Sequence, residues 1–189
     1  MPNNKHIIIL PWTPGSNWED LSSLPMSISM GMCDDLYAYS WVLSKKMDVS
    51  TDDIFLIVSP QCEVPSTPEY DWLRHTGARI GSFSGLCFLG VVQEVDEEDD
   101  GKKKLWLNIL FGILPGMIEN IDLKDLKAAF PSIDWDSKEE IILGQEEGDS
   151  LLEFVCRWLK KKQQILEYSD FSNILNRDID EVIEILHDS

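Results

Sequence analysis

Acidic side chains are the groups in this chain with the most potential for chemistry. The 189 residues include 34 Asp and Glu against 16 Lys and Arg, a formal net charge of −18. Such a surplus attracts cations and repels phosphate groups, so it argues against direct binding of nucleic acid and of acidic membrane surfaces. The charge therefore predicts a basic protein as the partner.

The acids are most concentrated between residues 134 and 153, where eight of them share a single base, Lys138. An aromatic side chain among these acids, Trp135, is typical of a hot spot that binds a basic protein surface. The predicted partner-binding residues are Asp134, Trp135, Asp136, Glu139, Glu140, Glu146 and Glu147. The alternative is that this charge run is a solvated face that keeps the protein in solution.

A second acidic run, residues 94–100, is a weaker candidate for a binding site. Residues 102–104 are lysines, and they are expected to lie opposite the acids in a hairpin and to neutralise them. The run also imitates the first half of a calcium-binding EF-hand loop, but Leu107 stands where that loop needs a bidentate Glu. We therefore predict no metal site.

Groups for catalysis are scattered. His6, His75 and His187 do not share a helical face, and the four cysteines contain no C-x-x-C pair. No phosphate-binding loop, nucleophile elbow or zinc-protease motif occurs, so we predict no catalytic residue and no cofactor. An alternative is a pocket or peptide groove lined by Trp12 and Trp18, because loops that leave parallel strands often bind ligands.

The apolar run near the N-terminus, residues 6–10, is halted by Pro11. It is too short for a signal peptide and far too short to cross a bilayer. These features predict a soluble cytoplasmic protein with reduced thiols.

Hydrophobic periodicity in the first half predicts alternating strands and helices. Strands are expected at 7–10, 54–58 and 79–83, with helices at 34–47 and 69–75 between them. This order is typical of a sheet with parallel strands.

Two long apolar runs, 86–95 and 104–113, flank Asp100-Gly101 and predict a β-hairpin with a two-residue type I′ turn. In that register Val95 faces Trp106, which makes Trp106 a core residue.

The last third is predicted to be helical. Helices are expected at 122–130, from a capping box formed by Ser150 and Glu153, and at 178–187. The whole chain, 1–189, is predicted to be a single α+β (or α/β) domain with a mixed sheet, a long central hairpin at 86–113 packed by helices, and a helical C-terminal portion. Its parts are an α/β-like half at 1–83, the hairpin at 84–114 and a mainly helical half at 115–189.

These patterns predict an acidic stoichiometric binding or inhibitor protein, immunity- or antitoxin-like, that masks a basic surface of a nuclease or other cationic toxin. Two alternatives remain open. One is a small α/β enzyme with its site in the loop after the first strand, and the other is a subunit or scaffold protein that docks through its C-terminal helices. The sequence leaves the oligomeric state open.

Overall fold

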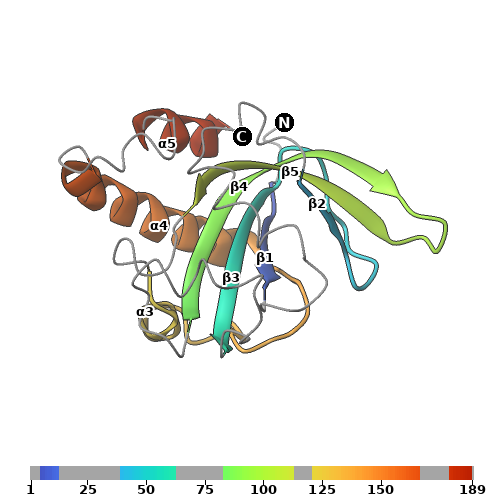
Figure 1. Ribbon diagram of the computed structural model, residues 1–189, viewed down its shortest axis with the longest axis horizontal. Coiled ribbons are helices and arrows are strands. Elements are labelled where there is room, and N and C mark those ends of the chain that lie inside the picture. Colours follow the sequence, from blue (N-terminus) through green and yellow to red (C-terminus); the bar gives the residue numbers. More distant parts are fainter. Residues whose placement is uncertain (1–4, 13–38, 63–82, 113–120, 167–178, 189) are drawn as a thin grey trace, which may run out of the picture.

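A computed structural model describes residues 5–12, 39–62, 83–112, 121–166 and 179–188 (Figure 1). Its strands are β1 (Ile7–Pro11), β2 (Tyr39–Val42), β3 (Ile54–Cys62), β4 (Phe83–Glu97), β5 (Lys103–Gly112) and β6 (Ile141–Ile142). Its helices are α3 (Leu123–Ala129), α4 (Gln145–Leu166) and α5 (Ile179–Asp188).

The strands form one curled sheet in the order β2-β5-β4-β3-β1-β6. β1 pairs with β3 in parallel, and the other neighbouring pairs are antiparallel. The sheet is therefore mixed, its longest strands are those of the central hairpin, and helices follow it in the chain. The predicted α+β fold is confirmed.

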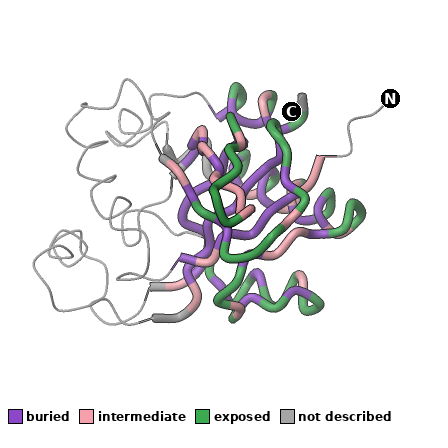
Figure 2. Tube along the Cα trace, turned by 90° about the vertical axis from the view of Figure 1, so that its right-hand side faces the viewer, coloured by how far each residue is buried: buried purple, intermediate pink, exposed green. Residues whose placement is uncertain are grey.

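Both faces of the sheet are buried in its central strands (Figure 2). Ile7 and Ile9 belong to the cluster that includes the apolar residues of α3, α4 and α5, whereas Ile8 and Leu10 belong to a second cluster on the opposite face. Successive residues of a strand point to opposite faces, so a strand that is covered on both sides becomes a continuous apolar run. This explains the sequence of β1.

The central hairpin forms as predicted, but its predicted register is wrong. The Glu98 N–H donates to the Lys102 carbonyl and the Gly101 N–H donates to the Glu98 carbonyl, each at 2.8 Å. These bonds close a loop of three residues, 99–101. Gly101 has φ 75°, so the glycine of the loop lies in the left-handed region. The loop is one residue longer than a type I′ turn, and Trp106 consequently lies opposite Glu94 instead of Val95.

Two helix predictions are also corrected. Residues 39–42 form strand β2 within the range 34–47 that was expected to be helical, and residues 34–38 lie outside the described residues. α4 begins at Gln145, five residues before the proposed cap at Ser150, whose hydroxyl donates to the Glu146 carbonyl inside the helix.

The other predicted elements agree with the structure where it describes them. The strands at 7–10 and 54–58 form as β1 and β3, and the helices at 122–130 and 178–187 form as α3 and α5. Asp122 caps α3 by accepting a hydrogen bond from the Lys124 N–H. The helix at 69–75 and most of the strand at 79–83 lie outside the described residues.

Candidate functional site

Trp135 is not the exposed aromatic anchor that its acidic neighbours suggested. Its side chain is 4% exposed and belongs to the helix-side core cluster. Its indole N–H donates to the Phe130 carbonyl at 2.9 Å, which satisfies the polar atom of the ring inside the core. The expected exposure of Trp135 is therefore wrong, and its contact with a partner stays a prediction.

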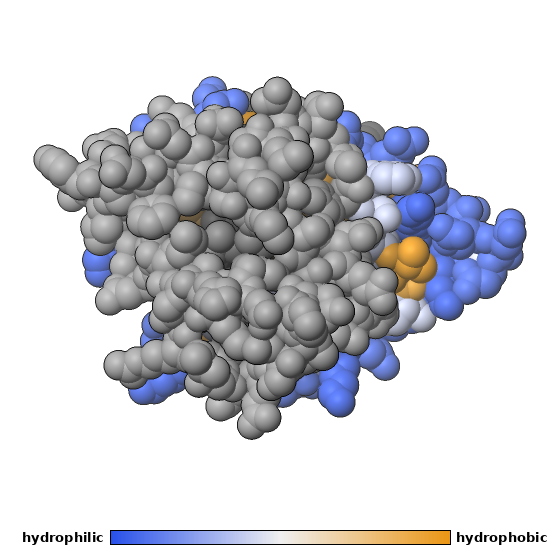
Figure 3. Space-filling model, viewed as in Figure 1, coloured by the Kyte–Doolittle hydropathy of each residue, from blue (hydrophilic) through white to orange (hydrophobic). Residues whose placement is uncertain are grey.

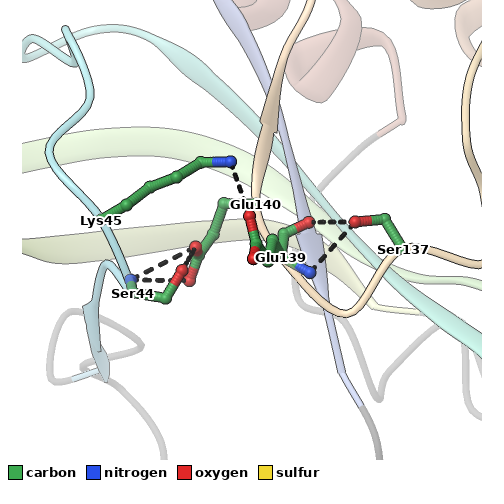
Figure 4. Close-up of polar contacts among 5 residues, drawn as sticks. All are labelled: Ser44, Lys45, Ser137, Glu139 and Glu140. Atoms are coloured by element: carbon green, nitrogen blue, oxygen red, sulfur yellow. Dashed lines mark hydrogen bonds and ion pairs between the residues drawn. The ribbon is translucent and has the colours of Figure 1, made fainter.

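Glu140 is also withdrawn from the surface, because it is 4% exposed. Figure 4 shows its carboxylate directed at Ser44. Its carboxylate accepts hydrogen bonds from the Trp41 indole N–H at 2.9 Å, from the Ser44 N–H at 3.2 Å and from the Ser44 hydroxyl. Trp41 lies on β2 and Glu140 directly precedes β6, and these strands are the two edges of the sheet. One buried carboxylate therefore joins the opposite edges of the curled sheet.

Two further acids of this segment are exposed but carry ion pairs with the protein's own lysines. Asp136 lies 2.7 Å from the Lys127 ammonium, and Glu139 lies 2.9 Å from the Lys45 ammonium. Asp134 is exposed and makes no ion pair with a described cation. Among the acids at 134–140, internal contacts thus account for three of the four.

Glu146 and Glu147 lie in the first turn of α4, where negative charge complements the helix dipole. Glu147 also accepts a hydrogen bond from the Ser132 hydroxyl. Both acids border a shallow, open depression of about 620 Å³. Its lining residues are Ala129, Phe130, Gly144, Gln145, Glu146, Glu147 and Ser150. A partner contact at these two acids stays a prediction.

A group of exposed acids lies at the free end of the central hairpin. We call residues 94–106 the arm; it extends away from α4 and α5 at the opposite end of the molecule (Figure 1). The same end is almost entirely hydrophilic at the surface (Figure 3). Six acids of the arm are exposed: Glu94, Asp96, Glu97, Glu98, Asp99 and Asp100.

The expected neutralisation of the arm by its lysines is incomplete. Lys102 pairs with Asp100 at 2.8 Å, and their hydrogen bond lowers the pKa of the Asp100 carboxyl. Lys103 instead donates to the Val49 carbonyl at 2.8 Å and lies 4.0 Å from Asp48. Four other exposed acids of the arm form no ion pair with a described Lys or Arg: Glu94, Glu97, Glu98 and Asp99.

Trp106 occupies the setting that the sequence suggested for Trp135. It is half-buried on the arm, opposite Glu94, and its indole N–H donates to Asp96 Oδ2 at 2.8 Å. The ammonium of Lys104 lies 4.6 Å from the centroid of its ring. Sequence reasoning missed this site because the assumed two-residue turn moved Trp106 to the core face. A three-residue loop, which an Asp-Asp-Gly sequence also permits, would have found it.

Of the two tryptophans suggested to line a pocket, Trp12 lies within the described residues. Trp12 is 2% exposed, its backbone N–H donates to the Val58 carbonyl at 2.9 Å, and its side chain packs in the second core cluster. Trp12 is therefore a core residue in the described part of the chain, its part in a pocket stays a prediction, and Trp18 lies outside the described residues.

Within the described part of the chain, no group of three or more His, Cys, Asp or Glu is arranged to hold a metal ion. None of the helices found there has the length and apolar character needed to cross a membrane. No protein-family model, curated protein or solved structure matches this chain. The charge and geometry of the arm are thus the basis for assigning a function.

Proposed function

We propose that this protein is an acidic stoichiometric binding protein that masks a basic surface of a partner protein, and that it does so through the arm. The observation that supports this proposal is the set of four exposed arm acids without an ion pair to a described cation: Glu94, Glu97, Glu98 and Asp99. Carboxylates gathered on a projecting two-stranded ribbon create a local negative potential that attracts and orients a cationic surface.

An immunity- or antitoxin-like inhibitor of a cationic nuclease or toxin is the most concrete form of this proposal. Its carboxylates would pair with the Lys and Arg side chains that otherwise hold phosphate. We place this activity in the cytoplasm, a compartment in which thiols such as those of Cys87 and Cys156 stay reduced.

A charge-neutralised arm tests the proposal. The variant Glu97→Gln/Glu98→Gln/Asp99→Asn removes three exposed charges from the arm, and the control Asp125→Asn/Glu181→Gln/Glu184→Gln removes three exposed charges of the same types from α3 and α5. Each protein is immobilised at low salt, an extract of the cells that produce it is applied, and bound proteins are eluted with rising salt.

We expect the wild type and the control to retain the same basic partner in a one-to-one ratio and to release it as salt rises. The arm variant should bind this partner about 3- to 150-fold more weakly, because each of the three exposed ion pairs contributes about 0.2–1 kcal/mol. Equal affinities of the arm variant and the control, or a retention that salt does not change, would contradict the proposal.

A further inference from the structure

The arm holds its own cation against the face of Trp106. The Lys104 ammonium lies 4.6 Å from the ring centroid, inside the range of about 6 Å in which the negative face of an indole attracts a cation. The ring is held in place by the 2.8 Å hydrogen bond from its N–H to Asp96. The arm therefore already contains a cation-binding aromatic surface.

The neighbours of this surface are arranged in two cross-strand rows. Val42, Lys104 and Asp96 lie side by side in one row, and Ser40, Trp106 and Glu94 form the next. Cross-strand partners share a face of the sheet, so the ring stands beside two carboxylates and beside Val42, which is 48% exposed. Figure 3 shows a hydrophobic area next to the hydrophilic end of the molecule. Tryptophan is among the residues most enriched in hot spots, and the carboxylates beside the ring suit a cationic partner.

Lys104 is free to leave this position. It is paired in register with Asp96, yet its ammonium forms no ion pair with a described carboxylate and lies over the ring instead. An exposed cation–π contact is worth only about 0.5–1 kcal/mol. A second cation that also reached Glu94 and Asp96 would gain more than Lys104 does.

We infer that Trp106 is the anchor for an arginine of the basic partner, and that Lys104 is an internal ligand which this arginine displaces. A guanidinium is planar, is weakly hydrated and stacks on aromatic faces, so it can cover the indole while its N–H groups donate to the neighbouring carboxylates. The inference rests on the proposed function for the class of partner, and it adds the contact through which the partner is held.

A nona-arginine peptide is a suitable probe. Binding is followed at low salt by NMR through the tryptophan indole N–H signals, and the Trp106 signal is assigned by its loss in Trp106→Phe. The informative comparison is Lys104→Gln with Lys102→Gln, because each variant removes one positive charge from the arm but only the first vacates the ring.

The peptide should shift the Trp106 signal in the wild type. Lys104→Gln should bind the peptide about two- to fivefold more tightly than Lys102→Gln. Trp106→Leu should weaken binding by a similar factor. If this variant does not fold, the comparison of Lys104→Gln with Lys102→Gln still tests the inference.

Equal affinities of the two lysine variants would overturn the inference. So would salt-dependent binding that leaves the Trp106 signal unmoved, although that result would agree with the broader proposal of an acidic binding surface. Absence of any salt-dependent binding to the wild type would overturn both.

Discussion

Replacement of Glu140 by Ala should destabilise the protein far more than the same change at the adjacent acid. Glu140→Ala removes the carboxylate that accepts from the Trp41 indole N–H and from the Ser44 N–H. The buried Trp41 N–H loses its acceptor, which costs about 1–3 kcal/mol, and the lost hydrogen bond of the part-buried Ser44 N–H adds about 1 kcal/mol, so the total loss should be about 2–4 kcal/mol. For a chain of this size the melting temperature should fall by about 4–16 °C.

Glu139→Ala is the matched control, since its ion pair joins side chains that are 49% and 66% exposed and should contribute less than about 1 kcal/mol. Urea unfolding of both variants, with Trp41→Phe and the double variant Trp41→Phe/Glu140→Ala, completes a double-mutant cycle. The Trp41–Glu140 coupling should be about 1–2 kcal/mol. If Glu140→Ala is no less stable than Glu139→Ala, the carboxylate does not hold the two sheet edges together.

Two further predictions concern the central hairpin. Gly90→Ala should lower the free energy of unfolding by about 2 kcal/mol or more, because an added Cβ would lie 2.0 Å from the Asn108 carbonyl oxygen. The control is Gly144→Ala, where the added Cβ meets nothing within 4 Å and creates no comparable clash. Equal losses of the two variants in urea unfolding would refute this explanation. The hydrogen bond from the Lys102 side chain lowers the pKa of Asp100 below its ordinary value of 3.8. The stabilising contribution of the ionised Asp100 carboxylate is therefore present above pH 3.8 and is lost as the pH falls through the lowered pKa. Lys102→Gln should raise this pKa toward 3.8 in an NMR titration of the Asp100 carboxyl, and an unchanged value would show that Lys102 is not its cause.

Much of the fold could be predicted because local patterns decide it. The apolar run of β1 and the four apolar positions of α5, spaced at i, i+3, i+4 and i+7, each indicate the correct element. β2 was missed because its few residues also fit a helical spacing, and pairing with β5 decided the outcome. The start of α4 was placed too late because a capping-box pattern also occurs inside helices.

The sequence by itself determined the large acidic surplus, the alternation that builds a mixed sheet and the helices that follow it, because composition and periodicity are properties of the chain alone. The tertiary structure decided which acids face solvent. Glu140 meets Trp41 and Ser44 across 99 and 96 residues of chain, and Trp135 is buried by α3 and its neighbours. One additional residue in the hairpin loop brought Trp106 beside Glu94 and Asp96. Burial and charge pairing depend on neighbours that are distant in sequence, so only the folded chain could move the candidate site from residues 134–147 to the arm.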